Sequence, residues 1–160
     1  YDFLYELVQK RITTFSYLKR VHEGRIHWFN TVCLSKEDLG MMYENARMKK
    51  RKSKITKHED SSFQESGEYT YLFVPNIPFD LDYFQTFYTL CDMLVEVYNK
   101  LLIGTTNTVA TNFIESVLKV DGKFKKIISQ VSKEIDTLAR NNLKEELRVI
   151  DPIVMMSPTN

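Results

Sequence analysis

Histidine pairs are the first residues to test for metal chemistry, and the spacing in this chain argues against a metal site. His22 and His27 lie five positions apart, so on a helix the two imidazoles would point in different directions. A zinc-binding helix instead places its two histidines four positions apart, on one face. No cysteine pair lies nearby to complete a structural zinc site. We therefore expect both to be hydrogen-bonded structural residues, and we expect no metal or other cofactor.

Asp92 and Glu96 are the carboxylates that could act together. They stand one helical turn apart, as an acid–base pair or the ligands of a helical metal centre would. The Glu-x-x-His partners of such a centre are missing, because no histidine follows position 58. Lys100, one turn further on, makes a ladder of surface charges the simpler interpretation.

Nucleophile and phosphate-binding motifs are missing as well. Cys33 and Cys91 have no basic residue at a motif spacing, and no Gly-x-Ser-x-Gly sequence occurs. Glycines occur singly, and Gly104-Thr-Thr-Asn lacks the lysine of a phosphate loop. The sequence therefore predicts a protein that is not an enzyme and has no small-molecule substrate. Each cysteine has apolar neighbours, which is typical of buried free thiols, and two cysteines do not form a secreted disulfide framework. We expect a protein of the cytoplasm, with the nucleus as the alternative.

The strongest local signal is a basic run. Its members are Arg47, Lys49, Lys50, Arg51, Lys52, Lys54 and Lys57. The composition of Lys49-Lys-Arg-Lys52 is that of a nuclear import signal, and such runs also bind anionic lipid or nucleic acid. Ser53 is a candidate phosphosite for a basophilic kinase, where a phosphate would cancel part of the charge.

A solvated linker is the alternative interpretation of this run, because acidic residues follow it. The formal net charge of +1 gives the whole chain no attraction to polyanions. We expect residues 47–68 to form an exposed, mobile connector.

Helical periodicity covers most of the remaining sequence. Apolar residues recur every three or four positions from Phe3 to Leu18, and Gly24 is a plausible stop. Ser35 is placed to cap a helix that carries an apolar stripe as far as Ala46. Residues 25–34 fit a short strand, extended chain or continued helix, and residues 69–79 fit extended chain or a marginal strand.

Two further helices are predicted in the C-terminal half. Residues 81–103 are apolar around most of the circumference, which predicts a central helix with several neighbours. Residues 107–150 predict one long helix whose phase continues through Asp121 and Gly122. Its apolar stripe consists of Phe113, Val117, Val120, Phe124, Ile127, Val131, Ile135 and Leu138. We expect this stripe to bind a partner.

Together these patterns predict an all-α fold, a helical bundle with a long C-terminal helix and short extended segments packed across it. We expect residues 1–160 to be a single domain and a fragment of a larger intracellular eukaryotic protein. The expected function is non-enzymatic protein–protein interaction, as a scaffold or adaptor that binds another protein or itself. The alternatives are a regulatory module of a small-GTPase or kinase pathway, and a module that contacts a membrane or nucleic acid through the basic run.

Overall fold

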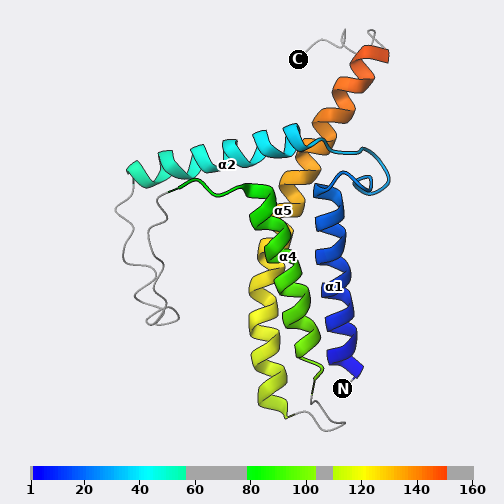
Figure 1. Ribbon diagram of the computed structural model, residues 1–160, viewed down its shortest axis with the longest axis vertical. Helices are drawn as coiled ribbons and strands as arrows, with labels where there is room; N and C mark the ends of the chain where they lie inside the picture. The colour runs from blue at the N-terminus through cyan, green and yellow to red at the C-terminus, as the bar shows by residue number, and fades with distance from the viewer. Residues whose placement is uncertain (1, 57–78, 104–109, 151–160) are drawn as a thin grey trace, which may run out of the picture.

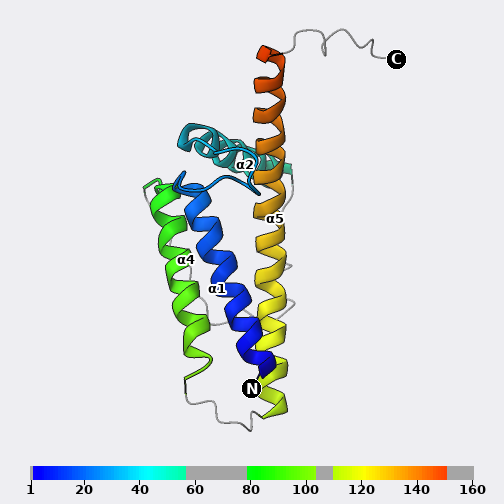
Figure 2. The same ribbon diagram turned by 90° about the vertical axis from the view of Figure 1, so that its right-hand side faces the viewer.

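The computed structural model describes residues 2–56, 79–103 and 110–150, which form four α-helices (Figure 1). These are α1 (Asp2–His22), α2 (Lys36–Thr56), α4 (Tyr83–Lys100) and α5 (Thr111–Ile150). Helices α1, α4 and α5 stand side by side, α2 crosses their top, and the end of α5 extends beyond α2 (Figures 1 and 2). The described residues contain no β-strand, which confirms the predicted all-α class. None of these helices combines the length and apolarity that a bilayer crossing requires.

Helices α1 and α5 are the central helices, because the buried side chains of each belong to both apolar clusters of the core. One cluster joins Leu4, Val8 and Phe15 of α1 to Tyr98 of α4 and Val117 of α5. The other joins Leu18 and Val21 of α1 to Trp28, Val32 and Leu34 of the following loop, Leu39 of α2, and Ile135 and Ala139 of α5. Burial of these side chains supplies most of the driving force for the fold.

Helix α4 is therefore not the central helix that its apolar circumference predicted. The helix itself is as expected, and the Asp82 carboxylate caps it by accepting a 2.8 Å hydrogen bond from the Gln85 amide. Its Leu90, Met93 and Val97 side chains, however, are 48%, 61% and 50% exposed. The share of a helix's circumference that is apolar does not reveal whether other helices of the same chain pack against that surface.

The segment 25–34 is a loop, which settles the alternatives that its sequence left open. An isolated antiparallel bridge joins Trp28 to Val32, without a strand on either side. Gly24 begins the loop at φ 71°, a left-handed conformation that glycine adopts without steric cost. The buried Trp28 side chain anchors the loop in the core and lies 3.4 Å from Asp136 of α5 through its Nε1–H.

Helix α2 continues to Thr56, ten positions beyond the last residue of its apolar stripe, Ala46. The helix therefore extends into the first part of the expected connector, because Lys, Arg and Met favour helix even without an apolar face. Ser35 caps α2 as predicted, and its hydroxyl accepts from the Asp38 amide at 3.0 Å. The remainder of the connector and residues 69–78 lie outside the described residues.

A buried ion pair joins the three upright helices. The Arg11 guanidinium on α1 donates from Nε and Nη2 to the two carboxylate oxygens of Asp121 on α5, at 2.6 and 2.9 Å. Tyr98 on α4 donates its hydroxyl to the same carboxylate at 2.8 Å. Burial alone would raise the pKa of Asp121, but the hydrogen bonds from Arg11 and Tyr98 outweigh it and hold that pKa below its ordinary value.

Replacing one partner of this ion pair is expected to destabilise the protein strongly. Asp121→Ala leaves a buried guanidinium without its counter-ion and should lower the free energy of unfolding by about 3–5 kcal/mol. Urea denaturation followed by circular dichroism measures the loss. The double variant Arg11→Met/Asp121→Ala should be less destabilised than the sum of the two single variants. Asp92→Ala, which removes the exposed ion pair with Lys19, is the control and should resemble wild type. Equal losses for Asp121→Ala and Asp92→Ala would contradict this account.

His22 forms a second polar contact within the core, between α1 and α4. Its Nδ1–H donates to the Leu18 carbonyl at 2.7 Å, which leaves Nε2 to accept from the Tyr83 hydroxyl at 2.8 Å. Burial raises the pKa of Tyr83 to about 12, so its phenol keeps the proton that it donates. The imidazole also stacks on Phe87, with ring centroids 3.9 Å apart. His22 is thus the hydrogen-bonded structural histidine that its spacing indicated.

Stability should fall as the pH decreases from neutral, because of His22. Burial lowers the pKa of His22 below its ordinary value, although the hydrogen bond to Leu18 opposes the shift. In the unfolded chain the imidazole binds its proton near pH 6.5, so below this pH the unfolded state binds more protons than the folded state. The free energy of unfolding should therefore decrease from about pH 6.5 down to the folded-state pKa. Denaturation of wild type and His22→Gln from pH 8 to 5 tests this, and an identical pH dependence in both would contradict it.

Candidate functional site

The long apolar stripe of α5 is divided between core and surface. Val117 and Ile135 are buried, and Phe124, Val131 and Leu138 pack half-buried against the core. Phe113, Val120 and Ile127 remain exposed, at 38%, 53% and 56%. Part of the predicted partner-binding stripe is thus structural, and the rest faces solvent.

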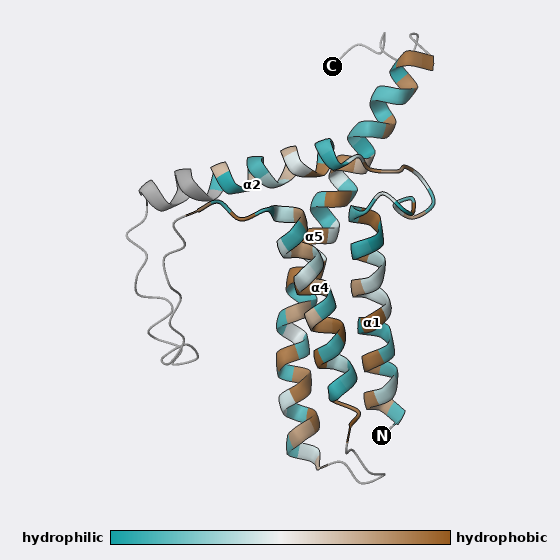
Figure 3. Ribbon diagram, in the orientation of Figure 1, coloured by the Kyte–Doolittle hydropathy of each residue, from teal (hydrophilic) through white to brown (hydrophobic). Residues whose placement is uncertain are grey.

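The exposed part of this stripe faces the exposed edge of α4. Asp92 and Val95 of α4 line a recess with α1, and helical geometry places Leu90, Met93 and Val97 on the side of α4 away from it. Val97 of α4 and Val120 of α5 line one hollow, and Ile127 follows Val120 by two turns on the same side of α5. We name the hollow between these two walls the α4/α5 groove. Its deepest part has a volume of about 190 Å³ and is lined by Val97, Tyr98, Leu101, Ser116, Val117, Val120, Asp121 and Phe124. The hydropathy colouring of Figure 3 shows hydrophobic bands along both helices.

The floor of the α4/α5 groove carries polar atoms that already have partners. Tyr98 and Asp121 bind each other, and Asp121 also binds Arg11. A ligand therefore meets an apolar surface over a satisfied polar network, which favours hydrophobic burial of a complementary surface. The described residues contain no group of three or more His, Cys, Asp or Glu side chains arranged to hold a metal ion.

The carboxylates that the sequence paired do not act together. Asp92 binds Lys19 of α1, at 2.7 Å from Nζ to both carboxylate oxygens. Glu96 instead lies 3.5 Å from Lys100, which confirms the ladder of surface charges. These are ion pairs on the helix surface.

The two cysteines differ in their surroundings. Cys91 is buried, as its neighbours predicted, and burial raises the pKa of its thiol to about 11. It is therefore a poor nucleophile at neutral pH. Cys33 is exposed, so its expected burial was wrong; the loop turns its Sγ outward, 3.4 Å from the Gly24 carbonyl.

The basic run begins on the described part of α2. Arg47 is engaged by Asp80 at 2.7 Å and by Glu44 at 3.5 Å, while Lys49 lines a shallow recess between α2 and α5. The side chains of residues 50–56, which include Lys50, Arg51, Lys52, Ser53 and Lys54, and the whole of Lys57 lie outside the described part of the chain. The import, polyanion-binding and phosphorylation roles of the run therefore stay predictions.

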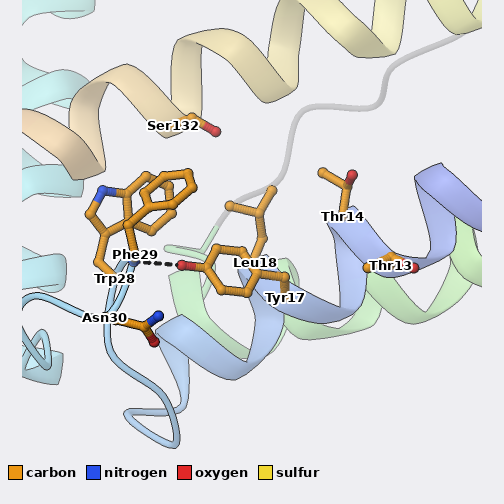
Figure 4. A pocket seen from close by; sticks show the side chains of 8 residues that line it. All are labelled: Thr13, Thr14, Tyr17, Leu18, Trp28, Phe29, Asn30 and Ser132. Carbon is orange, nitrogen blue, oxygen red and sulfur yellow. Dashed lines mark hydrogen bonds between the residues drawn. The ribbon is translucent and has the colours of Figure 1, made fainter.

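The sequence did not predict an aromatic recess that is formed by α1, the loop that follows it and Ser132 of α5 (Figure 4). Its volume is about 410 Å³, and its lining residues are Thr13, Thr14, Tyr17, Leu18, Trp28, Phe29, Asn30 and Ser132. No charged side chain lines it. The exposed Phe29 ring packs edge-on against Trp28, with centroids 4.7 Å apart. The three aromatic side chains make the recess suited to an apolar group.

The loop that forms this recess is held in a strained conformation. Phe29 and Asn30 both have positive φ angles, 42° and 57°, in the left-handed region that few non-glycine residues occupy. The Tyr17 hydroxyl supports the turn, because it accepts from the Phe29 amide at 2.8 Å and lies 3.4 Å from the His27 carbonyl. Asn30, a residue that tolerates this conformation, was the one sequence signal for the turn.

Comparison with known proteins yields no relative. No family model, no curated protein and no solved structure matches this chain. The site must therefore be interpreted from its own geometry.

Removing the Tyr17 hydroxyl should loosen the recess. Tyr17→Phe deletes the acceptor of the Phe29 amide and should cost about 1 kcal/mol in the free energy of unfolding. It should also speed hydrogen exchange at that amide, which nuclear magnetic resonance can follow. Tyr43→Phe is the matched control, because its ring stays stacked on Tyr83, 4.4 Å away. If exchange at the Phe29 amide is unchanged, Tyr17 does not support the turn.

Proposed function

We propose that this chain is a non-enzymatic protein-interaction domain, and that its α4/α5 groove receives a helix of another protein. The observation that carries the proposal is the set of exposed apolar side chains on two adjacent helices, all on the face away from α1. Helix α1 packs on one side of α4 and α5, and a further helix on the other side would complete a four-helix bundle.

The dimensions of the groove suit a helix. Its α4 wall presents Leu90, Met93 and Val97 at intervals of three and four residues, and its α5 wall presents Phe113, Val120 and Ile127 at intervals of seven, which is two turns. Such stripes match the ridges of an inserted helix. From Phe113 to Ile127 the α5 wall is about 21 Å long at 1.5 Å per residue, which accommodates about four turns of a partner helix.

The cysteines support the accompanying proposal that the domain works in the cytoplasm or nucleus. Both are free thiols, which persist in a reducing compartment. A scaffold or adaptor role fits a groove whose polar atoms are satisfied internally and whose apolar wall supplies the contact.

A photo-crosslinking residue placed in the groove tests this proposal. A benzoylphenylalanine at Met93 should crosslink a protein partner in cells, because this position is 61% exposed and stands one turn before Val97, which lines the groove. The same residue at Leu118, which is 41% exposed on the far side of α5, should not. Val120→Asp should reduce crosslinking from Met93 at least about tenfold, because a buried unpaired carboxylate is costly.

The matched control for this variant is Leu118→Asp, which places the same charge on the same helix outside the groove. Both variants should keep wild-type thermal stability, since both positions are exposed. Equal crosslinking from Met93 and Leu118, or crosslinking that survives Val120→Asp, would overturn the proposed site.

A further inference from the structure

We infer that the aromatic recess beside α1 binds a small uncharged molecule that carries an aromatic ring. The inference goes beyond the proposed function, because the recess and the α4/α5 groove share no lining residue. It concerns a bound ligand and no chemical step.

The recess has the size and the lining of a ligand site. Its volume of about 410 Å³ lies within the range of small-molecule pockets, roughly 300–1,000 Å³. Aromatic rings stand at the loop end, the hydroxyls of Thr13 and Thr14 lie one turn back along α1, and Ser132 comes from α5 on the opposite wall (Figure 4). Such a lining offers a planar apolar group a large contact area and a few polar atoms that can orient it.

The side chains of the recess indicate that its ligand is uncharged. No lysine, arginine, aspartate or glutamate lines it, so an ion would lose its hydration without gaining a counter-charge. Aromatic cages bind a cation between separated rings, whereas the rings of Tyr17, Trp28 and Phe29 pack on one another, with centroids 4.7–6.0 Å apart. The space between these rings is therefore filled, and the recess favours an uncharged molecule over an ammonium group or an anion.

Phe29 supplies the most accessible ring of the recess. This residue is 69% exposed, whereas Trp28 is buried and Tyr17 is half-buried. A strained turn keeps the ring in place, since Phe29 and Asn30 have left-handed φ angles and the Tyr17 hydroxyl holds the Phe29 amide. Backbone strain of this kind persists where the surrounding structure enforces it, and it is concentrated at functional sites such as ligand clamps. The turn thus presents a large apolar ring on which a ligand can stack.

Uncharged polar groups are available to orient the ligand. The side chains of Asn30 and Ser132 form no hydrogen bond within the part of the chain that the structure describes. The Thr14 hydroxyl donates to the Lys10 carbonyl at 2.7 Å, which leaves its oxygen able to accept. The Tyr17 hydroxyl is already engaged by the turn. A phenol or an amide on the ligand would match the groups that remain.

Two fluorescent probes test this site on the whole chain. N-phenylnaphthylamine is uncharged, and anilinonaphthalene sulfonate adds a negative charge to the same ring system. We expect the uncharged probe to bind at one site per chain and about tenfold more tightly, because the recess offers no counter-charge. Trp28 is the only tryptophan of the chain, so its indole N–H gives a single nuclear magnetic resonance signal, which the uncharged probe should shift.

Variants of the lining locate the bound probe. Phe29→Ala should weaken binding of the uncharged probe at least about tenfold, because the ligand loses the ring on which it stacks. Phe79→Ala is the matched control, since Phe79 is 67% exposed and does not line the recess, and this variant should bind like wild type. Both variants should keep wild-type thermal stability, because both side chains are exposed.

A second pair of variants fills one hollow or the other. Ser132→Leu places a larger side chain in the recess and should weaken binding of the uncharged probe. Ser116→Leu makes the same change in the α4/α5 groove and should leave binding unchanged. The opposite pattern would place the probe in the groove and overturn the inference.

Other results would also overturn it. These are equal affinities for the two probes, and binding that both Phe29→Ala and Ser132→Leu leave intact. A benzoylphenylalanine at Thr13 that crosslinks a protein in cells would replace the small molecule with a side chain of a partner. None of these outcomes depends on crosslinking from Met93, so the helix-binding role of the α4/α5 groove is tested separately.

Discussion

The ion pair between Arg11 and Asp121 is the constraint on which the arrangement of the bundle depends. It joins α1 to α5 across 110 residues of sequence, and Tyr98 brings α4 to the same carboxylate. Apolar side chains tolerate some sliding of one helix along another, whereas a bidentate pair has one geometry that satisfies both charges. Since a buried charge without its partner is costly, the contact fixes the register of all three helices. It also fixes which side of α4 and α5 turns toward α1, and therefore which side is left to form the α4/α5 groove.

The helices could be predicted from the sequence because each is encoded locally. Apolar periodicity marked α1 and the whole of α5, and the Ser35 cap marked the start of α2. The Arg11–Asp121 contact could not be predicted in this way. Asp121 precedes Gly122 within the continuous apolar repeat of this helix, and nothing near it in sequence indicates a partner on α1. The same limit explains the error about α4, because periodicity reports which residues share a face and not what covers that face.

The candidate site shows the same division between local and long-range information. The apolar stripe of α5 contained the right residues, but its spacing could not separate Ile135, which is fully buried, from Ile127, which is exposed. That difference arises from their neighbours, because Ile135 packs in one cluster with Trp28 and Leu39, whereas Ile127 is left exposed to solvent. The aromatic recess depends on two residues in the left-handed conformation, and that requires knowledge of the turn which Tyr17 supports.

The position of the ion pair has a consequence for binding at the groove. Tyr98 and Asp121 belong to the network that holds the bundle together, and they also form the floor of the groove. A helix seated over them would exclude water from that network and so strengthen its electrostatic interactions. Any partner that binds the folded state alone also raises its stability by mass action. Folding of the bundle and occupation of the groove should therefore be thermodynamically coupled, because both depend on α4 and α5 being held in the register that Arg11 sets.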